Sequence, residues 1–146
     1  MTHEIKKLKI GQKGEFHKTI TEYDVEAFAG LTGDYSRIHI DKDYAEEYRF
    51  GKQIAHGLIA ASFPSTVMGM TMPGPGCLFL DQYCEFKNPT FFGDTIHCEV
   101  EFVSYVEKTN VYIGEFVGKC YNQRGELVVD GRYHEMLPKD YFIIEE

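Results

Sequence analysis

The chain has 146 residues, of which 43% are hydrophobic and 14% aromatic, enough for one folded domain with a substantial core. This composition differs from that of disordered chains. The formal net charge of −8 argues against non-specific nucleic-acid binding, which requires a basic face.

The first elements are predicted from turn and capping residues. A short strand is expected at residues 14–19, and a helix follows it with Thr21 as its N-cap. Asp24, three residues later, completes an approximate capping box, and Gly30 and Gly33 mark the end of the helix. Asp41 is the expected N-cap of a second, short helix.

A third helix is predicted over residues 57–70 and is apolar on nearly all sides. A helix of this kind is usually buried. Pro64 lies inside it and is expected to kink it, because proline has no N–H and its ring crowds the preceding turn. The apolar run at residues 54–70 is too short and too often interrupted by polar residues to span a membrane. Residues 72–76 (MPGPG) then break the chain sharply.

The second half of the chain has strand periodicity. Apolar residues alternate within residues 77–87, 94–106, 111–121 and 126–136, and the breaks between these segments have turn compositions. Four long strands in succession favour an antiparallel sheet. We therefore expect an α+β fold in which the antiparallel sheet wraps round the central buried helix.

Cysteines and histidines give no sign of a disulfide framework or a metal site. The four cysteines form no C-x-x-C pair and lie in strand-like segments, where cysteine behaves as a small hydrophobe. His3, His17, His97 and His134 show no metal-ligand pattern. The N-terminus has no apolar core of signal-peptide length, so a cytoplasmic location is expected.

Two short segments point to chemistry. Residues 32–39 (TGDYSRIH) place Asp34 and His39 just after the first helix, where a carboxylate and an imidazole can share one water and move its protons. Residues 55–57 (AHG) lead into the third helix, whose first N–H groups lack internal partners. Those groups can hold an oxygen that gains negative charge. Such a combination suits the addition of water to a conjugated carbonyl.

These motifs resemble the MaoC-like dehydratase family, which includes the (R)-specific enoyl-CoA hydratases and has the hot-dog fold. The family pattern Gly-Asp-x-Asn-Pro-[Leu/Ile]-His-x-Asp, followed by [Ala/Val]-His-Gly, is similar to residues 33–41 (GDYSRIHID) and 55–57 (AHG). Residues 86–89 (FKNP) and 93–95 (GDT) also look like the sheet of this family. The resemblance covers nearly the whole chain and implies a single hot-dog domain over residues 1–146.

The resemblance implies reversible hydration of a trans-2-enoyl-CoA, or of a carrier-bound enoyl thioester, to a 3-hydroxyacyl thioester with (R) stereochemistry. Asp34 and His39 would be the catalytic pair. The Gly57 N–H would hold the thioester oxygen, and Ser65 would support it from further along the helix. Ser36 and His56 are expected to order the loops around the pair. The reaction needs neither a metal nor another cofactor, since the acyl thioester itself is the substrate.

Ser36 and Arg37 depart from the family pattern, because they replace its Asn-Pro dipeptide. Arg37 is expected to pair with Asp34 and weaken it as a base, to contact a substrate anion, or to face solvent. Three further cations are candidates, by charge alone, for binding carrier phosphates: Lys52, Lys87 and Arg132.

Two other functions stay open. A hot-dog thioesterase would hydrolyse the thioester, although the Asp–His pair ahead of Ala-His-Gly favours hydration. The other is a non-catalytic acyl-CoA-binding homologue, and the Ser36-Arg37 departure is its best support.

The resemblance also implies a homodimer or a multiple of dimers, because exposed sheet edges are often covered by partners. Neither nucleic acid nor a membrane is an expected partner.

Overall fold

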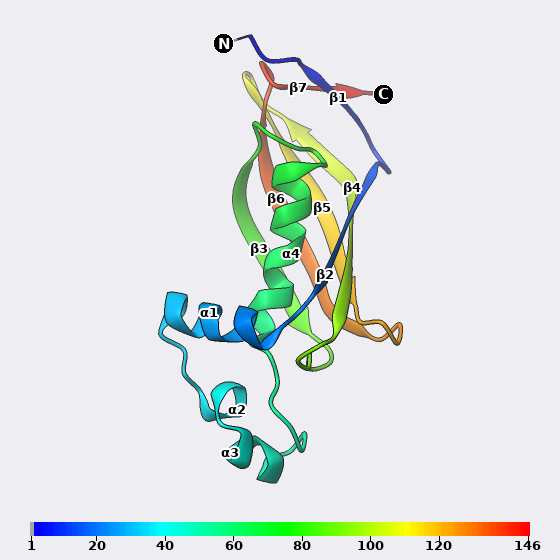
Figure 1. Cartoon of the computed structure of the whole chain (residues 1–146). Helices are drawn as coiled ribbons and strands as arrows, with labels where there is room; N and C mark the ends of the chain where they lie inside the picture. Colours follow the sequence, from blue (N-terminus) through cyan, green and yellow to red (C-terminus); the bar gives the residue numbers. More distant parts are fainter. Residues whose placement is uncertain (1) are drawn as a thin grey trace.

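The computed structural model describes residues 2–146, and its main sheet has five antiparallel strands in the order β2-β4-β5-β6-β3. The strands are β2 (Lys13–Thr19), β3 (Leu78–Phe86), β4 (Thr95–Glu107), β5 (Val111–Tyr121) and β6 (Leu127–Pro138). Helix α4 (Gly57–Met70) lies along one face of this sheet (Figure 1). The predicted α+β fold, with its sheet round a central helix, is confirmed.

The core lies between α4 and the face of the sheet turned toward it. On β4, alternate residues are fully buried, as the period of two predicts: Ile96, Cys98, Val100 and Phe102. The ring of Phe102 stacks on that of Phe116 from β5, with 5.0 Å between the ring centroids.

Helix α4 continues through Pro64 with the support of β5. Because proline has no N–H, the carbonyl of Ala60 loses its normal helical donor. The Cys120 thiol donates to that carbonyl at 3.6 Å. Gly118 leaves room for the proline ring, since a Cβ at this position would lie 3.1 Å from Pro64 Cβ. Two small residues of the sheet therefore accommodate a proline inside the helix.

Helix α4 is buried, as predicted, on the side that faces the sheet, but its other side is open. Leu58 and Met70 are 55% and 72% exposed. The sheet of one chain covers only one side of the helix. The open side continues onto β3, an edge strand whose Phe79 and Gln82 line a shallow depression together with Leu58 of the helix.

Helices α1 (Glu22–Thr32) and α3 (Lys42–Glu47) lie beyond the N-terminal end of α4 (Figure 1). Thr21 and Asp24 form the predicted capping box of α1, each side chain accepting from the other's backbone N–H. Asp41 caps α3, as predicted, by accepting from the Tyr44 N–H at 3.0 Å.

Helix α2 (Arg37–Ile40), between α1 and α3, was not predicted. It is a single turn, too short to show helical periodicity in the sequence. This turn carries His39, so the expected catalytic histidine comes from a helical turn and not from an open loop.

Two short strands at the chain ends also escaped prediction. β1 (Lys6–Lys9) and β7 (Phe142–Glu145) pair in parallel at the far end of the molecule from α1–α3 (Figure 1). Each has four residues, which is too few for alternation to be recognised. Leu8 and Phe142 are buried and close this end of the core.

Within residues 2–146, no helix combines the length and the apolar character needed to cross a membrane. The cytoplasmic location stays a prediction.

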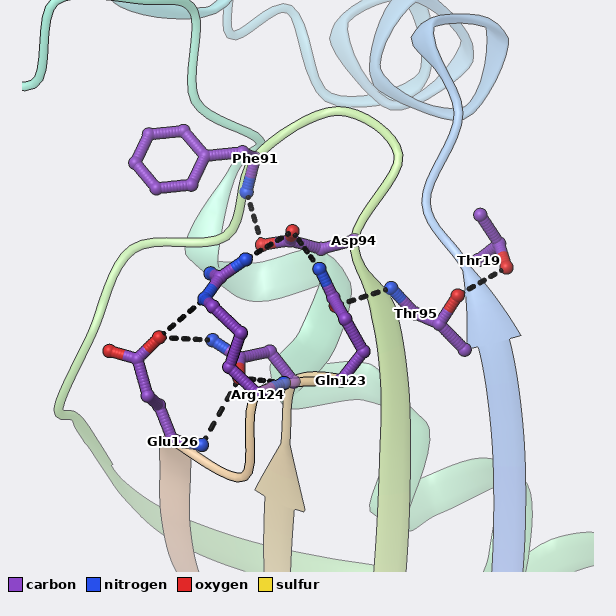
Figure 2. A network of polar contacts seen from close by, with 8 residues as sticks. Thr19, Phe91, Asp94, Thr95, Gln123, Arg124 and Glu126 are labelled. Carbon is purple, nitrogen blue, oxygen red and sulfur yellow. Dashed lines mark hydrogen bonds and ion pairs between the residues drawn. The ribbon is translucent and has the colours of Figure 1, made fainter.

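Asp94, at the start of β4, ties three segments together (Figure 2). Its buried carboxylate accepts hydrogen bonds from the Phe91 N–H at 2.9 Å, from the Gln123 side chain at 2.9 Å and from Arg124 at 3.5 Å. Gln123 also accepts from the Thr95 N–H at 3.0 Å. The network fixes the loop before β4 to the turn between β5 and β6.

That loop in turn holds the chain before α4. The Ala55 N–H donates to the Thr90 carbonyl at 2.8 Å, and Ile54 forms an isolated bridge with Phe91. The start of α4 is therefore positioned by the sheet through the loop that Asp94 anchors.

Candidate active site

The structure brings Asp34 and His39 together at the N-terminal end of α4. A carboxylate oxygen of Asp34, a ring nitrogen of His39 and a ring nitrogen of His56 lie within 4.8 Å of one another. Two groups at this separation can both hydrogen-bond one water, since each bond needs about 2.8 Å. The geometry suits the shared water that the sequence predicted.

Asp34 is held by the turn that leads into α2. Its Oδ1 accepts the Ser36 N–H at 3.1 Å, and this hydrogen bond to the charged form lowers the carboxyl pKa below 3.8. Its side chain is 46% exposed. Asp34 is therefore ionised at neutral pH and accessible to water. Ser36 supports it through its backbone, while the Ser36 side chain makes no capping bond to α2.

His39 is buried, and a backbone carbonyl fixes its tautomer. Its Nδ1 lies 2.7 Å from the Ile54 carbonyl oxygen, which can only accept, so Nδ1 carries the proton. In the neutral ring Nε2 then has a free lone pair. Burial lowers the His39 pKa below its ordinary 6.5, because it disfavours the charged ring. His39 is therefore neutral, and able to accept a proton, at pH 7.

His56 links the pair to α4. It is only 2% exposed, and its Nε2 donates to the Asp34 backbone carbonyl at 2.9 Å. Its ring stacks on that of His39, with 3.9 Å between centroids. His56 also precedes the first residue of α4. These contacts support the predicted ordering role for His56.

Gly57 begins α4, so its N–H has no acceptor within the helix. It lines a cavity of about 480 Å³ that His39 also lines. The Phe86 ring packs against Gly57 so closely that a Cβ there would lie 2.9 Å from Phe86 Cδ1. Only glycine leaves this N–H open beside the aromatic wall.

Among the polar residues of the cavity, Arg49 and Thr90 were not singled out in the sequence. Thr90 is buried, and its hydroxyl has no hydrogen-bond partner within residues 2–146. Arg49 forms no ion pair with a carboxylate in the part of the chain that the structure describes. Neither lies in a motif, and only the fold carries them to the cavity.

Ser65 lies apart from the cavity that His39 and Gly57 line. It is exposed on α4, in a shallow depression that Leu58, Phe79 and Gln82 also line. Its predicted supporting role stays a prediction.

Of the three alternatives for Arg37, the ion pair with Asp34 is not formed. Arg37 pairs with Asp41, whose Oδ2 accepts from its Nη2 at 2.8 Å, and its guanidinium lies 4.5 Å from the centre of the Tyr44 ring. One turn of α2 puts residues four apart on the same side. Arg37 therefore does not account for the lowered pKa of Asp34.

The three carrier-phosphate candidates are distributed differently. Lys87 lines the cavity and pairs with Glu85. Lys52 lies outside it, with Nζ 4.1 Å from the centre of the Phe91 ring. Arg132 pairs with Glu115 and lies on the face of the sheet turned away from α4, so it does not reach the cavity.

A sheet wrapped round one helix, with a carboxylate and an imidazole close together at the N-terminal end of that helix, defines a hot-dog protein. The model of the MaoC-like domain matches residues 6–116. An (R)-specific enoyl-CoA hydratase of Rhodospirillum rubrum is 35% identical over 93% of this chain and 92% of that relative. The chain belongs to the MaoC-like dehydratase family, and the predicted resemblance is confirmed.

Other relatives differ in carrier. A mitochondrial 3-hydroxyacyl-acyl-carrier-protein dehydratase of Solanum lycopersicum is 34% identical over 90% of this chain and 78% of its own length. The solved structure of an (R)-hydratase from Pseudomonas aeruginosa superposes with a TM-score of 0.84 at 33% identity, covering 90% of this chain and 83% of that one.

Proposed function

We propose that this chain is a lyase that adds water reversibly to a trans-2-enoyl thioester and forms the (R)-3-hydroxyacyl thioester. The observation that carries the proposal is the placement of ionised Asp34 and neutral His39 around one water position, at the edge of a cavity that Gly57 also lines. Relatives named as (R)-specific enoyl-CoA hydratases support the reaction and its stereochemistry.

The geometry assigns a role to each group. The Gly57 N–H, at the positive end of α4, binds the thioester oxygen and polarises the double bond. Asp34 accepts one hydrogen bond from the water and orients it. His39 Nε2 removes a proton as the water oxygen bonds to C3. The resulting enolate stays on the Gly57 N–H until a proton from the pair reaches C2. Dehydration is the reverse path.

The decisive experiment is a hydration assay on crotonyl-CoA and longer enoyl-CoAs. Loss of enoyl absorbance without release of free thiol, together with an (R)-3-hydroxyacyl product on chiral analysis, is the expected result. Release of thiol would identify a thioesterase instead. Tight binding of every thioester without turnover would identify a binding protein.

The carrier arm is expected to leave the cavity past Arg49 and Lys87, the two cations that line it. Both CoA and an acyl-carrier arm contain phosphate, so this chemistry fits either carrier. Comparing kcat/KM for the same acyl group on each carrier identifies the preferred one.

The pH dependence of hydration follows from His39. Its neutral form is the base, and burial lowers its pKa below 6.5. As pH falls through that lowered pKa, the ring gains a proton and the base is lost. We expect kcat/KM to be on a plateau at pH 7 and to fall only below pH 6.5. Initial rates across the acid range measure this midpoint, and a midpoint above 6.5 would assign the acid limb to another group.

We also propose that the chain forms a homodimer through β3, in line with the family resemblance. β3 pairs with β6 on one side only, and its Leu78, Leu80, Tyr83 and Phe86 are all at least 49% exposed. A second copy that adds its own β3 would pair the free edge and cover the open side of α4. Ser65 lies on this open side, and the partner copy would enclose it.

Placing a charge on this edge tests the dimer. Leu80→Lys is expected to convert the dimer to a monomer, because a lysine in a buried edge contact must lose its hydration. Light scattering at micromolar concentration gives the mass. Val106→Lys, which changes an equally exposed apolar residue at the end of β4, serves as the control and leaves the mass unchanged. A monomeric wild-type chain would refute the assembly.

A further inference from the structure

A second cluster of ligand-type side chains lies on the opposite face of the sheet from α4. It consists of Glu15 and His17 on β2 and His97 on β4, with one ligand atom from each within 4.8 Å of the others. His17 and His97 are directly opposite in the antiparallel register, and Glu15 is two residues before His17 on the same face. Their neighbours Ile96 and Cys98 are buried against α4, so these side chains point away from the core.

The cluster brings its ligand atoms close together, but its two rings are parallel and do not yet point at one position. The two imidazole rings are stacked, with centroids 4.3 Å apart and planes inclined by 5°. His97 Nε2 lies 3.4 Å from Glu15 Oε1. Tetrahedral zinc, with bonds of about 2.0–2.1 Å, needs ligand atoms roughly 3.4 Å apart. The Glu15–His97 pair already has this spacing, and only the exposed His17 ring must tilt to join it.

The histidines of this cluster have both ring nitrogens free of backbone contacts. No hydrogen bond to a backbone carbonyl engages His17 or His97 within residues 2–146, and His97 Nε2 is buried without a hydrogen-bond partner. The catalytic cluster differs, because His39 and His56 each commit a nitrogen to a backbone carbonyl. In the outer cluster, neither imidazole is held by a backbone carbonyl, so rotation of a ring toward a metal breaks no such hydrogen bond.

The surrounding charges also favour a cation. Glu15 is directly opposite Glu99 in the register, and two like charges in that position repel each other. Lys13 engages Glu99 at 3.2 Å and leaves Glu15 to His97. A divalent ion bound at Glu15 would offset the remaining repulsion.

We propose that Glu15, His17 and His97 form a binding site for Zn²⁺ that joins edge strand β2 to β4, independent of the catalytic site. Two imidazoles and one carboxylate are ligands that suit zinc and leave one coordination position for water. Because the ligands come from two strands, the ion would bind the folded sheet and not the unfolded chain. Zinc should thus stabilise the fold by mass action.

The test is calorimetric titration of the full chain with Zn²⁺, in a His39→Gln background that removes a ligand from the catalytic cluster. One zinc per chain is expected, with affinity at least about tenfold weaker in His17→Gln and in His97→Gln. His134→Gln changes an exposed histidine on the same face, paired with Asp81, and serves as the matched control with unchanged affinity. Zinc should also raise the melting temperature of the His39→Gln chain and not that of its His97→Gln derivative.

Co²⁺ supplies an independent readout, since its visible absorption reports nitrogen ligands directly. The proposal is overturned if His17→Gln and His97→Gln bind zinc as the parent does, or if the parent binds none at about 100 µM zinc. With His39 intact, hydration by His17→Gln should equal that of the wild type, because this cluster lies outside the cavity. Loss of zinc binding and loss of hydration are thus separate results.

Discussion

Asp34→Asn and His39→Gln are each expected to lower turnover of an enoyl thioester by at least ~10²-fold, the scale of general acid–base catalysis. Asparagine keeps an oxygen that can accept the Ser36 N–H, so the turn survives while the charge is lost. Glutamine can still donate toward the Ile54 carbonyl but cannot exchange a proton near neutral pH. Steady-state rates on crotonyl-CoA measure both effects.

The variant that carries both substitutions tests whether Asp34 and His39 act in one shared step or in two independent steps. If both groups act on one water, Asp34→Asn with His39→Gln should be little slower than the slower single variant. A second Asp–His pair, Asp81 and His134 at 2.8 Å on the outer face, supplies matched controls. Asp81→Asn and His134→Gln should retain full turnover. Near-normal hydration by either variant of the catalytic pair would remove that residue from the mechanism.

Asp94→Ala is expected to destabilise the fold by roughly 1–3 kcal/mol, because it removes the buried acceptor of the partly buried Phe91 N–H and releases the exposed Gln123 side chain. Urea denaturation measures the change in the free energy of unfolding. Turnover should also fall in the folded fraction, since the loop through Phe91 and Thr90 holds the start of α4.

Glu126→Gln is the control for Asp94→Ala. It removes the exposed partner of Arg124 in the same network and, as a surface ion pair, should cost no more than about 1 kcal/mol. Equal effects of the two substitutions would show that Asp94 is not the anchor. An unfolding free energy of Asp94→Ala within about 0.5 kcal/mol of the wild type would show the same.

Much of the fold was predictable because its signals are local. Thr21 and Asp41 are capping residues that predict the start of their helices. The alternation of apolar residues from Ile96 to Phe102 predicts a strand that is buried on one face. The features that could not be predicted depend on contacts between residues that are far apart in the sequence. The sequence of α4 gives no sign that one chain covers only one of its sides, or that Cys120 donates to the Ala60 carbonyl.

The same division applies to the sites. Asp34, His39 and Gly57 lie in short motifs, so the sequence alone could single them out as candidates. The tautomer of His39 was not predictable, because it depends on the Ile54 carbonyl, brought close only by folding. His17 and His97 showed no metal-ligand spacing because 79 positions separate them in the sequence, although they are direct neighbours in the sheet.

One short segment, residues 54–57, fixes the geometry of the proposed reaction. The Ile54 carbonyl holds His39, His56 holds the Asp34 backbone, and Gly57 presents the oxyanion donor. Arg49 and Phe50, which follow α3, take no part in these contacts, yet they line the cavity. The residues that position the proposed reacting groups and the residues that line the other part of the cavity thus lie in different segments of the chain. Changes in the length or charge of the segment with Arg49 and Phe50 are therefore expected to alter the preferred acyl group without disturbing the proposed proton transfer.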